Sequence, residues 1–371
     1  MTLEDFFKRI ELQYNQQLPF VLYRKPNKTE VKCLLQQSNE LFFTSEFTEQ
    51  GFVFSPFDDR EETVLIPLEN SESINIPFFT SDVVETSHYE SQSVLKAKNH
   101  HIKMVNRGVE AIINDSFKKV VLSRMETVSL SEANPISIFK KLLDKYASAF
   151  VYCWYHPKVG LWLGATPETL VKIEGNRFSI MALAGTQVYN GTMDVKWQDK
   201  EIQEQKIVTD FIVDCLKPSA ESIKISDTNT VKAGNLLHLK TMISAHLKSD
   251  SNLKKVILAI HPTPAVCGLP KQAAKDFILE HESYNREFYT GFLGELNLET
   301  TKTPRSGRRN VENRAYSITK NSTQLYVNLR CMQLLNSEAI IYVGGGVTLS
   351  SDPEKEWEET IAKSLVIKSI L

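Results

Sequence analysis

Acidic side chains occur at helical spacing in two segments that lie far apart in the chain. The run EKEWEETIAK places Glu356, Glu359 and Lys363 at positions i, i+3 and i+7, which share one face of a helix. The run DKEIQEQKIV places Glu201 and Glu204 three residues apart. Alone, each stripe is typical of a solvated helix face. Two carboxylates converging from both helices would suit Mg²⁺, because that ion prefers oxygen ligands.

Three further polar residues border apolar segments and have side chains capable of acid–base chemistry. Lys119 directly precedes the run VVLS; such a lysine is usually a solvated flank, but a buried amine is more easily neutral and can take a proton from water. Glu168 lies in the turn GATPETL, where a carboxylate is usually structural and a raised pKa would make it a proton donor. His261 ends the apolar run VILAIH, where a hydrogen-bonding role is the simplest interpretation.

The glycines Gly344 to Gly346 follow a predicted strand. They form neither a GxGxxG nor a GKS/T pattern, so the sequence does not indicate a nucleotide-binding loop. They indicate either a turn or a place where backbone N–H groups approach an anionic ligand, because glycine has no Cβ atom. Both interpretations stay open at this point.

The composition favours small-molecule chemistry in the cytoplasm. The chain has 371 residues, of which 42% are hydrophobic, and 43 basic residues nearly balance 45 acidic ones. We therefore expect no nucleic-acid partner and no membrane association. The cysteines are odd in number and lie far apart, without the spacing of a zinc site. This pattern predicts a reducing cytoplasmic location.

Alternating strand and helix patterns predict a mixed α/β chain. Short β-branched and aromatic runs, including VILAI at residues 256–260, indicate strands. Helical periodicity predicts helices at residues 95–114, 135–146, 196–215, 233–247, 271–282 and 353–369. Short links between the strands favour antiparallel pairing over a parallel doubly wound sheet. The Ser-, Thr- and Glu-rich stretch at residues 71–93 is the best candidate for a boundary.

Taken together, the motifs resemble the chorismate-binding enzymes, which include isochorismate, salicylate, anthranilate and aminodeoxychorismate synthases. The motifs occur in the family's order: KVVLSR, LGATPETL, ALAGT, KEIQEQKIV, HPTPAVCG, FYTGFLGE, VNLRC, VGGGV and DPEKEWEET. They cover residues 91–371, the expected catalytic core, whereas residues 1–90 are expected to be a divergent, strand-rich part of the same unit. The resemblance implies large antiparallel sheets packed face to face, with helices outside.

The resemblance also assigns roles to individual residues. Glu204 and Glu359 resemble the carboxylates that bind Mg²⁺, with Glu356 as a nearby helper. Lys119 would activate a water that attacks ring C2 of chorismate, while Glu168 would protonate the hydroxyl leaving from C4. The remaining expected contacts with the substrate are Arg330, which would bind the enolpyruvyl carboxylate, and Gly185, His261, Gly344 and Lys363.

Within the family, the sequence favours an isochorismate synthase. Lys119 stands where anthranilate synthases lack a lysine, and Ala184 replaces the nucleophilic lysine of some aminodeoxychorismate synthases. We therefore expect no glutaminase subunit. A salicylate synthase and a catalytically silent homologue remain alternatives, and the menaquinone or siderophore pathway and the oligomeric state stay open. Gln205 and Glu295 depart from the family pattern and put metal affinity and fine specificity in question.

Overall fold

Two antiparallel β-sheets form the interior of the computed structural model, which describes residues 1–79, 94–233, 236–302 and 318–371. Among these residues the first sheet has the order β15 (Gly268–Leu269), β7 (Lys119–Ser129), β19 (Glu338–Val347), β18 (Cys331–Leu335), β9 (Gly160–Thr166), β8 (Phe150–His156), β1 (Phe20–Arg24), β2 (Glu30–Gln36) and β6 (Ser71–Pro77). The second has the order β12 (Ala220–Ile225), β14 (Leu236–Leu247), β11 (Arg177–Val188), β10 (Thr169–Glu174), β17 (Ile318–Val327), β16 (Phe292–Lys302), β4 (Gly51–Ser55), β5 (Thr63–Pro67) and β3 (Phe42–Thr44), with β13 (Asn229–Ala233) beside β14.

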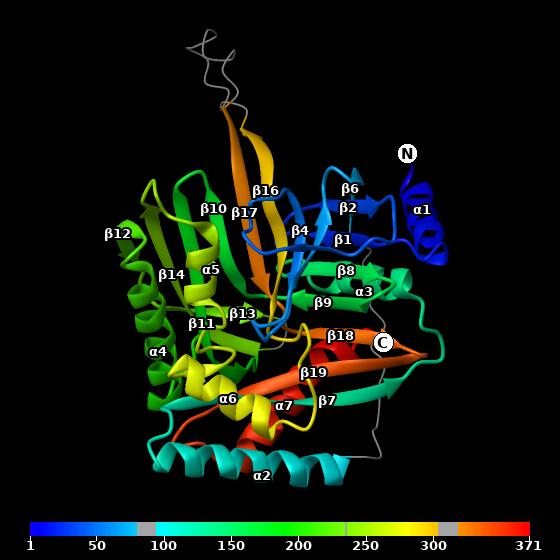
Figure 1. The fold of residues 1–371 in the computed structure, drawn as a ribbon. Helices are drawn as coiled ribbons and strands as arrows, with labels where there is room; N and C mark the ends of the chain where they lie inside the picture. Colours follow the sequence, from blue (N-terminus) through cyan, green and yellow to red (C-terminus); the bar gives the residue numbers. More distant parts are fainter. Residues whose placement is uncertain (80–93, 234–235, 303–317) are drawn as a thin grey trace.

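The sheets face one another across an aromatic core. In Figure 1, strands β7 and β19 of the first sheet run roughly horizontally. Strands β14 and β17 of the second sheet run steeply from bottom to top. The ring of Phe54 on β4 lies 5.1 Å from that of Trp154 on β8 and 6.0 Å from that of Trp162 on β9. Phe150 of β8 stacks on Tyr326 of β17 at 4.0 Å. Burial of these large rings holds the two sheets together.

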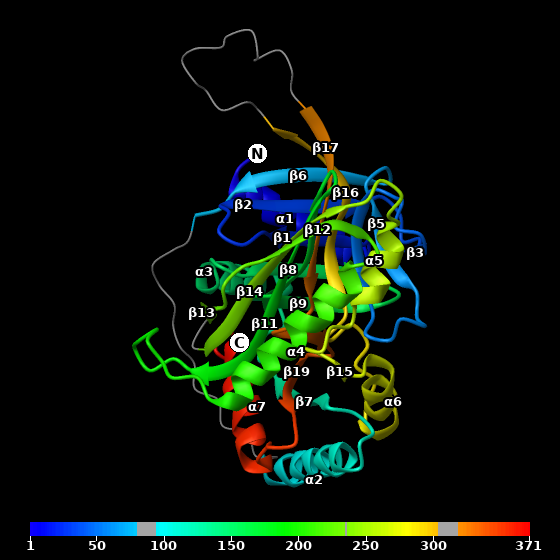
Figure 2. The same ribbon diagram turned by 90° about the vertical axis from the view of Figure 1, so that its left-hand side faces the viewer.

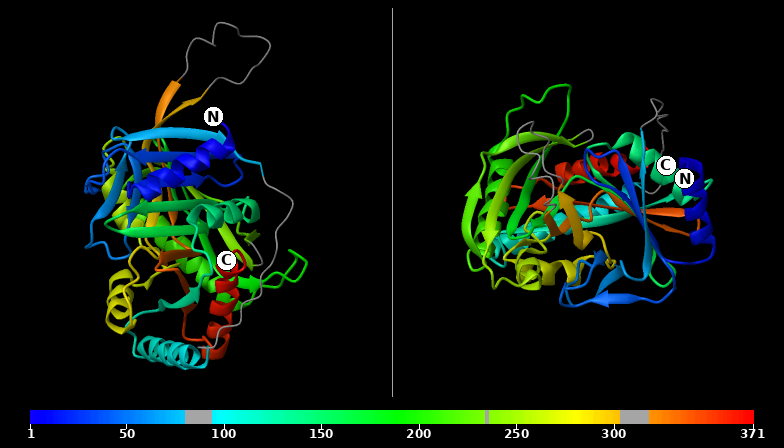
Figure 3. Two further views of the ribbon diagram at one scale, coloured as in Figure 1. Left: turned by 90° about the vertical axis from the view of Figure 1, so that its right-hand side faces the viewer. Right: turned by 90° about the horizontal axis from the view of Figure 1, so that it is seen from above.

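Helices cover the outer sides of the sheets (Figures 2 and 3). They are α1 (Leu3–Asn15), α2 (Val94–Ile113), α3 (Pro135–Lys145), α4 (Asp199–Leu216), α5 (Leu253–Ile260), α6 (Lys271–His281) and α7 (Pro353–Lys368). Phe6 of α1 and Phe139 of α3 belong to the apolar cluster of the first sheet, whereas Val208 of α4 and Ile257 of α5 belong to that of the second. Each helix thus buries one apolar face and leaves the other to solvent.

Local sequence determines where the two acidic helices begin. The carboxylate of Asp352 accepts hydrogen bonds from two backbone N–H groups of α7 at 2.9 and 3.1 Å, and Pro353 occupies the first helical position. Glu356 therefore lies in the first turn of α7. In α4 the Glu201 side chain accepts a 2.9 Å hydrogen bond from the backbone N–H of Gln198, which precedes the helix.

The predicted architecture of large antiparallel sheets with outer helices is confirmed. Two element assignments are wrong. Residues 256–260, predicted as a strand, lie in α5, where Asn252 caps the helix by accepting a hydrogen bond from Lys255 N–H. The predicted helix at residues 233–247 is instead largely β14, whose pairing with β11 across the sheet overrides the helical periodicity.

The first 79 residues contribute strands to both sheets. β1 pairs with β2 and β8 in the first sheet, and β4 pairs with β16 in the second. The expected boundary between residues 90 and 91 lies outside the described residues, so the division into two parts stays a prediction. In the described chain, no helix is both long and apolar enough to cross a membrane.

Candidate active site

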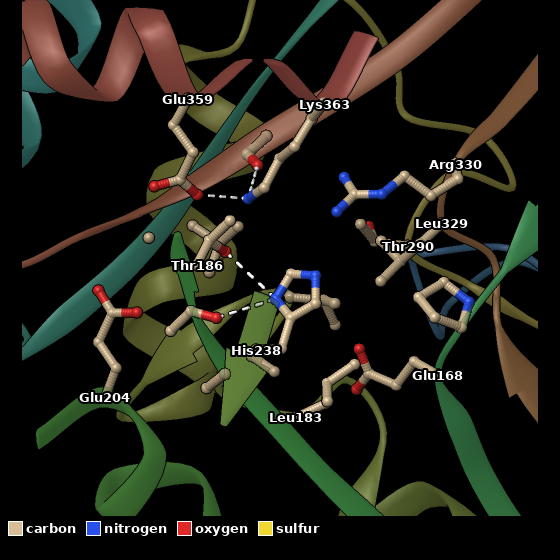
Figure 4. A pocket seen from close by; sticks show the side chains of 18 of the residues that line it. Glu168, Leu183, Thr186, Glu204, His238, Thr290, Leu329, Arg330, Glu359 and Lys363 are labelled. Carbon is tan, nitrogen blue, oxygen red and sulfur yellow. Dashed lines mark hydrogen bonds and ion pairs between the residues drawn. The ribbon is translucent and has the colours of Figure 1, made fainter. Parts of the chain in front are cut away.

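Both sheets and helices α4 and α7 contribute residues to one cavity. The predicted residues in its lining are Lys119, Glu168, Gly185, Glu204, Arg330, Gly344, Glu359 and Lys363. Figure 4 shows Glu204 and Glu359 on one side of the cavity, and Glu168 and Arg330 on the other. The fold therefore brings together carboxylates and cations from segments that are distant in sequence.

Glu168 and Arg330 lie where the chain crosses from one sheet to the other. Glu168 connects β9 of the first sheet to β10 of the second, and Arg330 connects β17 of the second to β18 of the first. The two crossings are hydrogen-bonded to each other. The Val327 N–H donates to the Glu168 carbonyl at 3.1 Å, and the Ala165 N–H donates to the Arg330 carbonyl at 3.0 Å. The backbone thus fixes the positions from which both side chains reach the cavity.

Burial gives Glu168 the properties of a proton donor. The residue is 3% exposed, and burial raises the pKa of its carboxyl to about 8, although Lys119, Arg330 and Lys363 favour the charged form. Desolvation outweighs three nearby cations because it penalises the carboxylate directly. At neutral pH the group keeps its proton and can donate it to a leaving oxygen.

Lys119 lies at the first position of β7, which is enclosed between β15 and β19. The residue is 2% exposed. Its Nζ lies 3.9 Å from Oε2 of Glu204, which is its one ion-pair partner among the described residues and is too distant for a normal hydrogen bond. A buried amine that is near a carboxylate without being bonded to it is well placed to accept a proton from a bound water.

The glycines of β19 leave space for these side chains. A Cβ on Gly346 would lie 3.0 Å from Cε of Lys119 and 3.3 Å from Oε1 of Glu204. A Cβ on Gly345 would lie 3.3 Å from Oε2 of Glu356 and 3.6 Å from Oε1 of Glu359. The glycine run is therefore part of a strand, and it allows three carboxylates and an amine to approach the backbone.

The carboxylates of α7 are paired with lysines. Glu359 and the carbonyl of Gly344 both accept hydrogen bonds from Nζ of Lys363. Burial opposes ionisation of Glu359, but Lys363 and Lys200 outweigh it and hold the pKa of that carboxyl below its ordinary value. Glu356 is 1% exposed and pairs with Lys200. Burial and the neighbouring Glu359 raise the pKa of Glu356.

These residues fit a Mg²⁺ ion that takes part of its ligand shell from elsewhere. Oε2 of Glu356 is buried without a hydrogen bond of normal geometry, and Glu204, Glu356 and Glu359 all face adjacent glycines of β19. Within the described residues, no three His, Cys, Asp or Glu side chains are arranged closely enough to hold a metal by themselves. Mg²⁺ commonly uses one or two carboxylates together with waters and a substrate oxygen, so this donor set suits it.

Arg330 supplies a guanidinium for an anionic ligand. Its side chain makes no hydrogen bond or ion pair within the described part of the chain, although it faces the cavity (Figure 4). Burial lowers the pKa of Arg330, against the effect of Tyr289, Glu359 and Glu168. A planar guanidinium without a protein partner is well suited to bind a carboxylate through two hydrogen bonds.

The histidine in the cavity wall is His238 of β14, whereas His261 does not reach the lining. His261 follows the last turn of α5, and its ring packs edge-to-face on Phe292 at 4.9 Å, so it lies behind the wall. Nδ1 of His238 lies 2.9 Å from the Gly185 carbonyl, which fixes Nδ1 as the donor, and Nε2 has no partner among the described residues. Burial lowers the pKa of His238 to about 3, so the ring is neutral.

Gln205, the first of the two departures from the pattern of the resembled family, supports helix α4 from behind. Its Nε2 donates to the Ala182 carbonyl at 3.0 Å and to Oγ1 of Thr241 at 2.9 Å. These bonds fasten the turn of α4 that carries Glu204 to β11 and β14 of the second sheet.

Glu295, the second departure, links the two sheets away from the cavity. It accepts a 2.7 Å hydrogen bond from the hydroxyl of Tyr23 on β1 and pairs with Lys25 and Lys32. Burial opposes its ionisation, but these two lysines outweigh that effect and lower the pKa of Glu295. Its role in this structure is to bridge β16 to β1 and β2.

The chain matches protein-family models and curated relatives. Residues 60–302 match the model of a chorismate-binding enzyme family, and residues 316–369 match a second model of the same description. A salicylate biosynthesis isochorismate synthase of Pseudomonas aeruginosa is 28% identical over 276 residues, which span 72% of this chain and 53% of that protein. The isochorismate synthase EntC of Escherichia coli is 24% identical, over 83% of this chain and 77% of EntC.

The fold is shared with a solved structure. MenF, described as the menaquinone-specific isochorismate synthase of Escherichia coli, superposes with a TM-score of 0.73 over 96% of this chain and 89% of that one, at 18% identity. At this identity the similarity establishes the arrangement of sheets and helices, while the chemistry depends on the cavity itself.

Proposed function

Since the chain belongs to the chorismate-binding enzyme family, we propose that it converts chorismate to isochorismate with the help of Mg²⁺. The observation that carries the proposal is that a buried amine, Lys119, and a buried carboxyl with a raised pKa, Glu168, line one cavity. An acid and a base poised together near neutral pH are what this isomerisation requires. The similarity of the chain to isochorismate synthases supports the choice of reaction.

In the proposed reaction a water oxygen forms a bond to ring C2 while the bond from C4 to its hydroxyl breaks. Lys119 takes a proton from the attacking water, and Glu168 gives its proton to the leaving hydroxyl, which departs as water. The ring double bonds shift between the two carbons, so the net change is an isomerisation without an oxidant or reductant. Lys119 lies beside Glu204, and Glu168 lies across the cavity from Glu204, which suits attack and departure at separate carbons.

The other residues bind and orient the substrate. Arg330 would bind the enolpyruvyl carboxylate, and Lys363 with the backbone at Gly185 and Gly344 would contact the rest of the anion. Glu204 and Glu359, with Glu356 beside them, would hold Mg²⁺. When bound, that ion polarises the ring carboxylate of chorismate and draws electron density from the ring. His238 offers Nε2 as an acceptor for a hydroxyl of the substrate.

A reducing cytoplasm is part of the proposal, because all five cysteines are free thiols. The use of water as the nucleophile means that no ammonia-supplying glutaminase subunit is required.

Product analysis tests the proposal. Purified protein is incubated with chorismate, with and without Mg²⁺, and with ammonium as a competing nucleophile, and the products are separated by chromatography. Isochorismate that forms only with Mg²⁺ is the expected result. Salicylate with pyruvate would assign the chain to the salicylate synthases, and an aminated product would contradict the role of Lys119. No conversion under any condition would indicate a silent homologue.

Substituting Gly346 with alanine is expected to lower kcat/KM for chorismate at least tenfold. The new Cβ would displace the Lys119 amine or the Glu204 carboxylate, and small displacements of reacting groups cost activity steeply. Steady-state kinetics measures the loss. Gly108→Ala in α2 is the matched control, since its Cβ would meet apolar side chains at 3.2 to 3.4 Å outside the cavity lining. Equal effects in both variants would mean that crowding of the fold, rather than of the site, explains the result.

A further inference from the structure

An ion pair joins helices α4 and α7 beside the carboxylates of the proposed metal site. Lys200, in the first turn of α4, pairs through Nζ with Oε1 of Glu356, in the first turn of α7. Both residues line a polar groove that shares Thr186 and Glu359 with the cavity. The Lys200 side chain is 25% exposed, whereas that of Glu356 is 1% exposed. The pair therefore lies in the wall of this groove, with its carboxylate buried and its ammonium partly exposed.

The Lys200 charge acts on all three carboxylates of the proposed metal site. Burial disfavours its ammonium, but Glu356, Glu204 and Glu359 together outweigh that effect and raise the pKa of Lys200. A cation in this position neutralises part of the repulsion among the acids. The same charge repels any second cation that approaches them.

We propose that Lys200 competes with Mg²⁺ for Glu356, so that the bridge between α4 and α7 and the binding of the metal exclude one another. This inference rests on the metal site of the proposed function and adds a residue that sets its affinity. In the chain without ligands, Lys200 balances part of the negative charge of the carboxylates and thereby weakens Mg²⁺ binding. A substrate carboxylate adds a ligand to the ion, so metal and substrate are favoured to bind together.

The competition is tested with Lys200→Met, which removes the charge at similar length, and with Lys200→Arg, which keeps it. Lys206→Met is the matched control, because Lys206 lies on the same helix, is 72% exposed and pairs with Asp210. Binding of Mg²⁺ without chorismate is measured by titration calorimetry. We expect Lys200→Met to bind Mg²⁺ about tenfold more tightly than the unmodified chain. Lys200→Arg and Lys206→Met should stay within about threefold of it.

Thermal unfolding provides an independent readout. Without Mg²⁺, Lys200→Met should unfold at a lower temperature, because Glu356 is left buried and unpaired. Saturating Mg²⁺ should raise its unfolding temperature more than that of the unmodified chain. If the variant is unfolded without Mg²⁺, its folding on addition of the ion supports the inference, and failure to fold overturns it.

Failure of this inference can be distinguished from failure of the proposed function. An unmodified chain that binds Mg²⁺, together with a Lys200→Met variant of equal or weaker affinity, overturns the inference alone. An unmodified chain that binds no Mg²⁺ even with chorismate present contradicts the metal assignment of the proposed function, and the inference with it.

Discussion

Replacement of Lys119 by alanine is expected to lower kcat for isochorismate formation by about a thousandfold while the chain still folds. The amine is the one group in the cavity assigned to take a proton from the attacking water. Without it, only substrate binding and the acid Glu168 remain to promote the reaction. Because Lys119 contacts Glu204 only at 3.9 Å, its loss breaks no close ion pair. Initial rates measured by chromatography, with circular dichroism as a check on folding, provide the test.

The neighbouring Lys118 provides the control for this prediction. It is exposed and precedes the same strand, so Lys118→Ala removes an equal charge outside the cavity lining. Its backbone hydrogen bond to the Leu269 carbonyl is retained in alanine. Lys118→Ala should keep nearly full activity. Activity of Lys119→Ala close to that of Lys118→Ala would refute the assignment of the base.

Glu168→Gln is expected to lower kcat by about a hundredfold or more, because an amide cannot donate the proton that the leaving hydroxyl requires. The substitution keeps the shape of the side chain, so KM should change much less than kcat. Glu287→Gln is the matched control. Burial also raises the pKa of Glu287, but that residue lies outside the lining of the cavity. A similar loss in both variants would show that the effect is general rather than catalytic.

The pKa of Glu168 also predicts how activity depends on pH. The acid must be protonated to act, and burial raises its pKa to about 8. Activity in the unmodified chain should therefore decline as pH rises through about 8. A rate profile across this range measures the effect, and a constant rate up to pH 10 would contradict the assignment.

The same pKa shift links Glu168 to stability. The folded state holds a proton between the ordinary carboxyl pKa of 4.5 and about 8, where the unfolded chain has lost it. The contribution of Glu168 to the free energy of unfolding is therefore fully present below pH 4.5. It decreases as the pH rises towards 8, by up to about 1.4 kcal/mol per pH unit. Glu168→Gln removes this pH-dependent contribution to stability. Denaturant titrations should show the variant gaining stability relative to the unmodified chain from pH 5 to pH 8.

Much of the fold could be predicted because periodicity reports burial. The apolar stripes of α2, α3, α4, α6 and α7 have helical spacing, and each packs against a sheet or a neighbouring helix. Residues 256–260 fail this test because a short apolar run is equally compatible with a buried helix and a strand. The cap at Asn252 and the packing of Ile257 against α4 and the second sheet decide for the helix.

The error at β14 explains why His238 was missed. In a helix over residues 233–247 the His238 side chain would not lie beside Gly185, whereas the pairing of β14 with β11 places it there. The motif HPTPAV instead drew attention to His261. The backbone between β14 and β11, which sets the contact between Nδ1 of His238 and the Gly185 carbonyl, depends on pairing between distant strands.

The predicted site residues that line the cavity come from motifs that the fold directs inward, such as Lys119 at the start of β7, Glu204 on α4 and Glu359 on α7. The link between Glu168 and Arg330 was beyond prediction, since it depends on two sheet crossings joined by backbone hydrogen bonds. The same is true of the pair between Lys200 and Glu356, whose residues belong to helices that meet only in three dimensions.

The central claim is that a water activated at Lys119 attacks C2 while the C4 hydroxyl leaves. Mass spectrometry of the product formed in H₂¹⁸O, at early conversion, tests it most directly. The expected result is isochorismate that carries one ¹⁸O atom, located at the C2 hydroxyl. Isochorismate without ¹⁸O would show that the C4 oxygen moved to C2 without exchange with water, and would contradict the proposed roles of both Lys119 and Glu168.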